Sequence, residues 1–352
     1  MRTKTCVVIV GGGGCSGALV AAQLLRHGYR GGIVMVEPRR ELGRGLAYST
    51  QFEEHLLNVP AGKMSAFPEQ PSHFLDWLRS NGMQSATPGT FAPRRKYGEY
   101  LSDLLRNEVN RSPSGAHFWQ ICGEAIAVTP DRESAHVELS NGDAIEASKV
   151  VLAIGNPASS PAVDAVIDGV DRLLQPSPWL GDALSLRFPS ERIMLLGSGL
   201  TAVDSMLTLL AQSENSQVIM VSRRGILPQM HEACLPAPVF APLEKHLGAT
   251  SILHEVRARV EAMRQMGLCW RVTIDALRPI SNRIWSDLSL ADRQRFLRHL
   301  KPYWEPHRHR MAPVVADRVR HFRADGRLSL IAGRVRKLSR KDGSIQVRIS
   351  RN

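Results

Sequence analysis

Apolar positions along the chain form the same arrangement twice: a short apolar run, a glycine-rich break, and a stretch with helical spacing. The first copy starts at Cys6 to Val10, and its helical stretch begins at Ala18. The second copy starts at Ile193 to Leu196. Each copy continues into a further apolar run, Ile33 to Val36 and Gln217 to Val221. Short apolar runs that alternate with helices are typical of parallel strands and their crossovers. The pattern therefore predicts an α/β fold with two βαβ units.

The first glycine-rich break fits the spacing G-x-G-x-x-G at Gly12, Gly14 and Gly17. Gly12 would permit the turn, Gly14 would let a pyrophosphate approach the backbone, and Gly17 would bring helix and strand together. Glu37 follows at the end of the next apolar run, where a carboxylate can accept hydrogen bonds from ribose hydroxyls. The sequence thus predicts a dinucleotide site rather than an unliganded glycine turn. Because Gly11 lengthens the glycine run, the register could shift by one residue.

The second break repeats the motif with a different ending. Gly197, Gly199 and Ala202 fit G-x-G-x-x-A, but the following apolar run ends in Arg223 and Arg224 instead of an acid. An arginine at this place can pair with a 2′-phosphate, which favours NADPH over NADH. The alternative is that both arginines are ordinary surface charges.

The segments between and after these copies predict further strands and a boundary. A β-meander is expected over His117 to Thr129, Ala135 to Leu139 and Ala144 to Glu146. Val150 to Ile154 is predicted as a buried parallel strand, and the proline-rich stretch Ser159 to Pro189 as a linker between domains.

Near the C-terminus, Ser289 and Asp292 predict a capping box for a helix from Leu290 to Leu300, which Pro302 should stop. The chain then ends in three predicted strands, Leu328 to Ala332, Val335 to Leu338 and Ile345 to Ile349.

The net charge of +12 is concentrated at one end of the 352-residue chain. Residues 291–352 hold 17 Lys and Arg against 5 Asp and Glu, so the rest of the chain is balanced. This segment lacks the interleaved aromatic residues of a single-strand binder, so solvated surface and dinucleotide phosphates explain it better than nucleic acid. No run is long enough to span a bilayer and no signal peptide is evident, which predicts a cytoplasmic protein without a membrane partner. The sequence leaves open whether the protein forms a homo-oligomer.

Five scattered cysteines without any C-x-x-C predict neither a disulfide framework nor a metal site. Cys15 lies inside the glycine turn, where a small filler is favoured over a reactive thiol.

A set of motifs in one order resembles the bacterial FAD-NAD(P)-binding family. They are VVIVGGGGCSG with Glu37, GRGLAYST, HLLNVPAGKMSAFP, PRRKYGEYL, VVLAIGNP, GSGLTAVD, VSRRGILPQMH and HRHRMAP. That family includes HpyO-type FAD-dependent urate hydroxylases and nitrosuccinate-forming aspartate N-oxidising monooxygenases. More distantly, the chain resembles flavoproteins that hydroxylate amines of lysine and ornithine.

The resemblance implies two Rossmann-like domains of the glutathione-reductase and flavin-monooxygenase type, with the NAD(P)H domain inserted in the FAD domain. Residues 1–165 would form the first part of the FAD domain, 185–325 the NAD(P)H domain with a helical insertion, and 326–352 the strands that return to the FAD domain. Relatives complete the FAD site with a further strand after this meander, so a truncated chain is expected.

The resemblance also implies which residues hold FAD and NADPH (or NADH). Glu37 would bind the adenosine ribose, Ala125 the adenine through its backbone, and the segment Asn58 to Met64 would lie near the isoalloxazine. Gly155 would mark the crossing between domains. The implied cofactor-binding residues are Gly12, Gly14, Ser16, Gly17, Glu37, Pro38, Arg44, Asn58, Met64, Ala125, Gly155, Gly197, Gly199, Ala202, Arg223 and Arg224.

The implied activity is that of an FAD-dependent, NAD(P)H-using monooxygenase that hydroxylates a small nitrogenous substrate with O2 through a C4a-hydroperoxyflavin. Because the cofactor performs the difficult step, no acid-base triad need be visible, and the catalytic residues stay unknown. The alternatives are a flavin/NAD(P)H reductase and a truncated non-catalytic dinucleotide-binding protein. A disulfide reductase is disfavoured because no C-x-x-C follows either glycine turn.

Overall fold

The computed structural model describes residues 6–112, 117–155, 166–170, 174–175, 177–179, 183–185, 191–232, 248–342 and 344–351. They divide into two compact units, which are described separately. The first is Met1–Ala162 with Trp179–Gly181, and the second is Val163–Pro178 with Asp182–Asn352. Most of the predicted linker, 159–189, lies outside the described residues.

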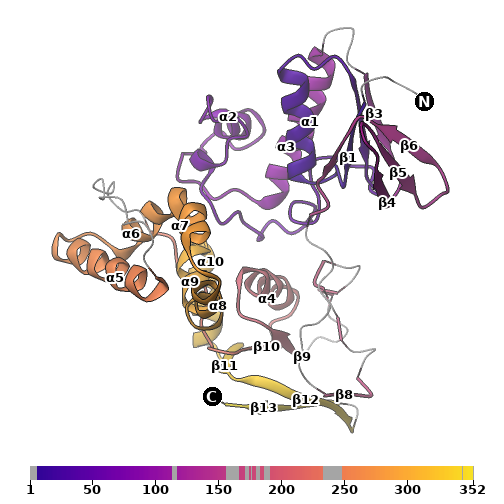
Figure 1. The fold of residues 1–352 in the computed structure, drawn as a ribbon. Coiled ribbons are helices and arrows are strands. Elements are labelled where there is room, and N and C mark those ends of the chain that lie inside the picture. Colours follow the sequence, from indigo (N-terminus) through magenta and orange to yellow (C-terminus); the bar gives the residue numbers. More distant parts are fainter. Residues whose placement is uncertain are drawn as a thin grey trace. The chain divides into compact units, whose positions relative to one another are not determined.

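The first unit is built on a four-stranded parallel sheet of order β3-β2-β1-β7. Its strands are β1 (Cys6–Val10), β2 (Gly32–Val36), β3 (His117–Ile121) and β7 (Lys149–Leu152). The helical elements are α1 (Cys15–Arg26), η1 (Ala61–Lys63), α2 (His73–Ser80) and α3 (Arg94–Arg111). A second, antiparallel sheet has the order β4-β5-β6, with β4 (Ala125–Pro130), β5 (Ala135–Leu139) and β6 (Ala144–Ala147). Figure 1 shows α1 and α3 side by side on one face of the parallel sheet.

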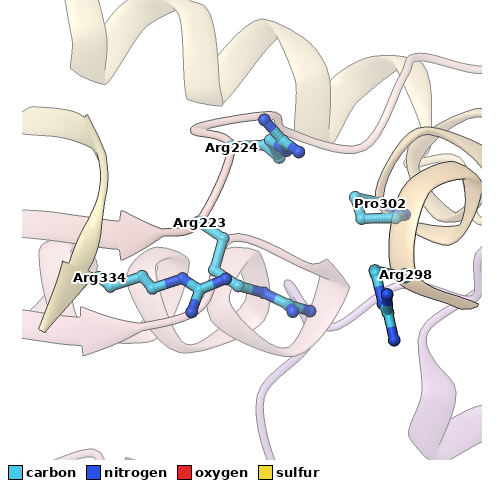
Figure 2. Close-up of a pocket in the computed structure, with 5 residues that line it drawn as sticks. All are labelled: Arg223, Arg224, Arg298, Pro302 and Arg334. Atoms are coloured by element: carbon cyan, nitrogen blue, oxygen red, sulfur yellow. The ribbon is translucent and has the colours of Figure 1, made fainter. Parts of the chain in front are cut away.

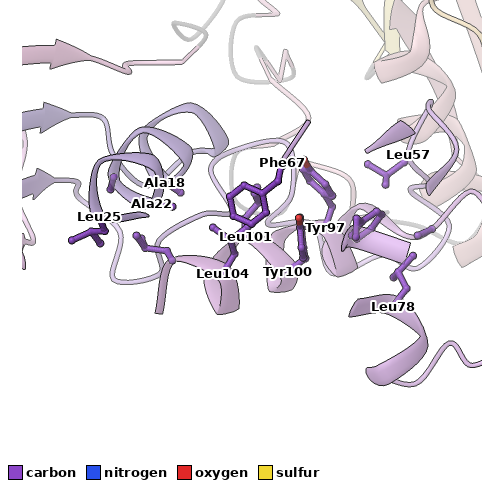
Figure 3. Close-up of a cluster of buried hydrophobic side chains, with 14 of the residues drawn as sticks. Ala18, Ala22, Leu25, Leu57, Phe67, Leu78, Tyr97, Tyr100, Leu101 and Leu104 are labelled. Carbon is purple, nitrogen blue, oxygen red and sulfur yellow. The ribbon is translucent and has the colours of Figure 1, made fainter. Parts of the chain in front are cut away.

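The central strand β1 is apolar at every position because both of its faces are covered. Val7 and Ile9 belong to a core cluster with side chains of α1 and α3, and Figure 3 shows part of that cluster. Val8 and Val10 belong to a separate cluster that includes Val137 of the antiparallel sheet. Full burial of such side chains contributes about 1.5–3 kcal/mol each to stability. The first unit therefore has three layers: helices, parallel sheet and meander.

Two details of this unit differ from the sequence prediction. The segment His117 to Thr129 is not one meander strand, because it breaks at residues 122–124 and its first half joins the parallel sheet as β3. The strand β7 pairs with β1 as predicted, but it is not buried throughout. Leu152 is 63% exposed and Ile154, just beyond the strand, is 67% exposed.

The second unit contains another parallel sheet, of order β11-β10-β9. The strands are β9 (Arg192–Leu196), β10 (Gln217–Ser222) and β11 (Leu328–Ala332), and α4 (Leu200–Gln212) connects the first two. A further sheet of order β13-β12-β8 is formed by β8 (Val166–Asp168), β12 (Arg334–Lys341) and β13 (Ser344–Ser350).

The crossover from β10 to β11 carries the helical insertion. Its elements are α5 (Ala249–Gln265), α6 (Trp270–Leu277), η3 (Arg278–Ile280), α7 (Ser281–Asp287), α8 (Leu290–Arg295), the π-helical turn η4 (Phe296–Leu300), α9 (Lys301–Arg308) and α10 (Pro313–Ala324). The Ser289 half of the predicted capping box is present, since Asp292 N–H donates to Ser289 Oγ at 3.1 Å. Pro302 does not stop the helix. It lies in the first turn of α9, which directly continues the π-helical turn η4.

Residues 326–352, which the sequence predicts to return to the first domain, lie in the second unit. The strand β11 pairs in parallel with β10, from Val218 opposite Leu328 to Ser222 opposite Ala332. The strands β12 and β13 pair with each other and with β8, all within the second unit. The helical insertion is the crossover that follows β10, and it leads to β11 as the third parallel strand of the same sheet.

Cys269 is disulfide-bonded, a bond that the scattered cysteine pattern did not predict. Cys6, Cys15 and Cys122 are free.

Candidate dinucleotide-binding sites

The first glycine turn joins β1 to α1 at the carboxyl end of the parallel sheet. The residue with left-handed backbone is Gly11, with a φ of 75°, rather than Gly12 as the spacing suggested. Gly12 has a different reason to lack a side chain, because a Cβ there would lie 2.6 Å from the Met35 side chain. Gly17 has the predicted role: its Cβ would lie 2.5 Å from Gly12 Cα, so helix and turn touch.

Glu37, at the end of β2, is buried and closes over this turn. Its Oε2 accepts a hydrogen bond from Gly13 N–H at 3.0 Å, and its Oε1 accepts one from Arg39 N–H at 3.3 Å. The sequence predicted a carboxylate at this edge but not its bond to Gly13. Each carboxylate oxygen has a second lone pair, so Glu37 can hold the turn and still accept from a ribose hydroxyl.

The helix α1 begins with Gly14 as its N-cap and lacks an acidic residue in its first turn. Its first amides have no partner within the helix, and the helix dipole adds positive potential there. Ser16 is exposed on this turn, and Pro38 is exposed just after Glu37. These features together form an anion-binding edge beside a carboxylate.

Arg44 and Gly45 approach the same turn from the loop after β2. Gly45 N–H donates to Gly13 O at 2.7 Å, and a Cβ on Gly45 would lie 2.8 Å from Gly14 Cα. The Arg44 Nε atom is buried without a hydrogen-bond partner among the described residues. The Arg44 guanidinium is ion-paired, with Nη1 3.2 Å from Glu41 Oε2, and its Cγ lies beside Gly98 of α3. The backbone amides of the turn, rather than Arg44, are the donors that fit the pyrophosphate of a dinucleotide.

The other predicted residues of the first site are more spread out. Gly155 follows Ile154, whose Cα lies 2.7 Å from the position of a Cβ on Gly11, so it borders the turn. Ala125 begins β4 and packs against the meander-side core. Met64 follows η1 and packs on the helix-side core. Asn58 precedes η1 in the same segment of the chain.

Cys15 is a packing residue rather than an activated thiol. Burial raises the pKa of its thiol, and the hydrogen bond with Tyr97 offsets this only in part. The pKa of Tyr97 is also raised, chiefly by burial. Both groups therefore stay protonated at neutral pH.

The second glycine turn leaves open space where the first is filled. Gly197 has a φ of 115°, and its N–H donates to Val221 O at 2.8 Å. Gly199 is the N-cap of α4, and a Cβ there would meet no atom within 4 Å. Ala202 is half-buried in the first turn of α4. Among the described residues nothing fills the space at Gly199, which leaves this backbone open to a ligand.

This second turn is tied to the two predicted arginines. The Ser198 hydroxyl lies 2.8 Å from Ser222 Oγ and 2.7 Å from Ile226 O, and these two residues flank Arg223 and Arg224. Both arginines line a cavity of about 100 Å3 whose other lining residues are Arg298, Pro302 and Arg334. Figure 2 shows the Arg223 and Arg334 side chains extending toward the helix that carries Arg298 and Pro302. The sequence missed Arg298 and Arg334, although a parallel assignment of Leu328 to Ala332 would have placed Arg334 at this edge.

Comparisons with known proteins agree with this architecture. Residues 8–157 match the protein family described as FAD-NAD(P)-binding. No curated protein sequence matches the chain. Among solved structures, an ornithine N-hydroxylase from Kutzneria sp. 744, described with reduced FAD, NADP+ and L-ornithine, is similar. It has a TM-score of 0.57 and 16% identity over 98% of this chain and 75% of the other.

Two further enzymes are similar at comparable levels. The L-lysine 6-monooxygenase from Pseudomonas syringae gives a TM-score of 0.56 with 16% identity, over 98% of this chain and 75% of that enzyme. The reduced ornithine hydroxylase from Pseudomonas aeruginosa gives 0.55 with 16% identity, over 99% and 77%. The chain shares its fold with these enzymes. The predicted α/β class with two Rossmann-like parallel sheets is thereby confirmed.

In the described part of the chain, no helix combines the length and apolarity needed to cross a bilayer. No group of three or more metal-ligating side chains gathers in that part either.

Proposed function

We propose that this protein is an FAD-dependent, NADPH-using oxidoreductase of the monooxygenase type, acting on a small nitrogen-containing substrate with O2. The observation that supports it most strongly is the presence of two glycine turns with opposite charge at the end of the following strand. Glu37 is beside the first turn, and Arg223 and Arg224 are beside the second. One site is thus suited to a ribose with free hydroxyls, and the other to a phosphorylated ribose.

Two observations support FAD at the first turn. The amides at the start of α1 would bind a pyrophosphate, and Glu37 offers acceptors for ribose hydroxyls. When bound, FAD supplies hydride acceptance and O2 activation. The residues of this chain bind and orient it, and we assign the first turn to FAD and the second to NADPH.

The finer resemblance stays a prediction. Urate hydroxylases, aspartate N-oxidising enzymes and the ornithine and lysine N-hydroxylases with the same fold all act on small nitrogenous compounds. We therefore place the substrate in that class without choosing a member.

A visible spectrum of the purified full chain, reconstituted with FAD, tests this proposal. We expect retained flavin bands that NADPH bleaches without oxygen and that return when air is admitted. Adding urate, aspartate, ornithine and lysine one at a time should then couple NADPH oxidation to a hydroxylated product for one of them.

Other outcomes would select an alternative. Flavin that cycles with NADPH but yields only peroxide with every compound would favour a flavin reductase. A protein that retains no FAD after reconstitution would refute the proposal and favour a non-catalytic dinucleotide-binding protein.

A further inference from the structure

The carboxyl ends of two adjacent strands bring two arginines together in the second unit. The last residue of β10, Ser222, pairs with the last residue of β11, Ala332. Directly afterwards, Gly333 N–H donates to Ser222 O at 2.9 Å. Arg223 directly follows β10, and Arg334 lies two residues beyond the end of β11. Both arginines therefore lie at the carboxyl ends of these two strands. This edge of a parallel sheet is where ligands bind in open α/β folds.

Two glycines keep these arginines in place. Gly225 has a φ of 60°, and a Cβ there would lie 3.0 Å from the Ala332 side chain. A Cβ on Gly333 would lie 2.5 Å from the Ile349 side chain and 2.8 Å from Ser350 O. A larger residue at Gly225 or Gly333 would therefore move apart the two turns that carry Arg223 and Arg334.

The rest of the cavity lining comes from the helical insertion and from Arg224, the residue after Arg223. Arg298 projects from the π-helical turn Phe296–Leu300, and Pro302 follows at the start of α9. Arg224 lies with its guanidinium 5.9 Å from the ring centre of Tyr303 on α9. The insertion thus faces the sheet edge across a space of about 100 Å3.

The charge of this cavity is one-sided. Its lining residues are four arginines and a proline, with no carboxylate. Two neighbouring arginines of the insertion do have acidic partners: Arg295 lies 3.5 Å from Asp292 and Arg278 lies 3.8 Å from Asp275. Within the described part of the chain no ion pair is found for Arg298 or Arg334. Like charges gathered around one cavity repel one another, and a bound anion relieves that repulsion.

We infer that Arg298 and Arg334 complete a clamp, with Arg223 and Arg224, for a phosphate dianion, and that the dianion is the 2′-phosphate of NADPH. This inference rests on the proposed function for the identity of the coenzyme. It adds that the helical insertion itself contacts the 2′-phosphate. Coenzyme binding would then hold η4 and α9 against the edge of the sheet that contains β10 and β11.

Binding of 2′,5′-ADP and of 5′-ADP to the full chain, measured by calorimetry, tests the clamp without FAD, O2 or substrate. The unsubstituted protein should prefer 2′,5′-ADP. Arg298→Gln and Arg334→Gln should each reduce that preference about tenfold, because each removes a charge-assisted hydrogen bond to phosphate. Affinity for 5′-ADP should change little.

Two matched variants remove the same charge from nearby exposed positions. Arg295→Gln lies one helical turn before Arg298, and Arg340→Gln lies on β12 with Arg334. Both should keep the preference. Hydrogen exchange should also slow over residues 296–302 when 2′,5′-ADP binds, but not when 5′-ADP binds.

The result that overturns the clamp is an equal loss of preference in clamp and control variants, or no preference in the unsubstituted protein. The two proposals fail separately. If the four arginines confer a preference for 2′,5′-ADP over 5′-ADP but the protein does not oxidise NADPH, only the proposed function is refuted. An NADPH-oxidising enzyme whose Arg298 and Arg334 variants keep the full preference would refute only the clamp.

Discussion

The two glycine turns of this protein share a sequence pattern but differ in how they are held. The first is closely packed: Gly17 touches Gly12, and Glu37 is bound to Gly13 N–H. The second is open around Gly199, and its serine is tied to a turn that carries arginines. The comparison shows that the motif sets the backbone of a phosphate turn, whereas the residue after the next strand sets the charge that its ligand meets.

The largest effect is expected from filling the contact between helix and turn at the first site. Gly17→Ala would place Cβ 2.5 Å from the backbone of Gly12, which cannot move away as a side chain could. Overpacking of this kind costs about 1–3 kcal/mol. A lower midpoint of thermal unfolding should report it. Gly14→Ala in the same turn, where Cβ would be 4.0 Å from the nearest atom, should keep the midpoint unchanged, and equal losses in both variants would contradict this account.

Removing the carboxylate that closes the first turn should have the next largest effect. Glu37→Ala leaves the buried Gly13 N–H without its acceptor, a loss of about 1–3 kcal/mol in stability. Urea titration followed by circular dichroism would measure it. Glu37→Gln keeps an acceptor oxygen and should unfold at a higher urea concentration than Glu37→Ala. If both variants behave alike, the carboxylate does not hold the turn.

At the second turn, the comparison predicts a change in coenzyme choice rather than in stability. Arg223→Gln should lower the ratio of NADPH to NADH affinity about tenfold, the effect of one lost charge-assisted hydrogen bond. Fluorescence titration with each coenzyme would measure this ratio. Arg192→Gln, at the opposite end of the same sheet, is the control for net charge. A similar fall in both variants would show that the arginine acts only through overall charge.

The smallest effect concerns the acid stability of the first unit. Burial lowers the pKa of His73 from 6.5, with Arg26 adding to it and Asp76 and Glu108 opposing it. The unfolded chain therefore takes up a proton first as the pH falls below 6.5, and stability is lost down to the lowered pKa of the folded state. His73 Nδ1 lies 2.7 Å from the Tyr100 hydroxyl, a contact that Gln can replace.

His73→Gln should accordingly reduce the difference in unfolding midpoint between pH 7.5 and pH 5.5. The exposed His27 supplies a matched variant, His27→Gln, that should keep the full difference. If His73→Gln keeps the full difference in unfolding midpoint, protonation of His73 does not cause the loss of stability between pH 7.5 and pH 5.5.

The sequence by itself determined the repeated strand, turn and helix units, the α/β class, and the opposite charges beside the two turns. These features depend on local chemistry. Apolar periodicity, glycine spacing and the residue that follows a strand are all read within some thirty positions, about the length of a βαβ unit. The predicted N-cap at Ser289 is likewise a local feature, and its bond with Asp292 N–H is present.

Only the tertiary structure decided which strands pair and which distant side chains meet. The strand Leu328–Ala332 could have joined either sheet, and its parallel register with β10 placed Arg334 beside Arg223. The bond from Gly13 to Glu37 and the approach of Arg298 likewise join residues far apart in the chain. Such contacts depend on how a crossover of about a hundred residues folds back onto its sheet, and no local pattern encodes that distance.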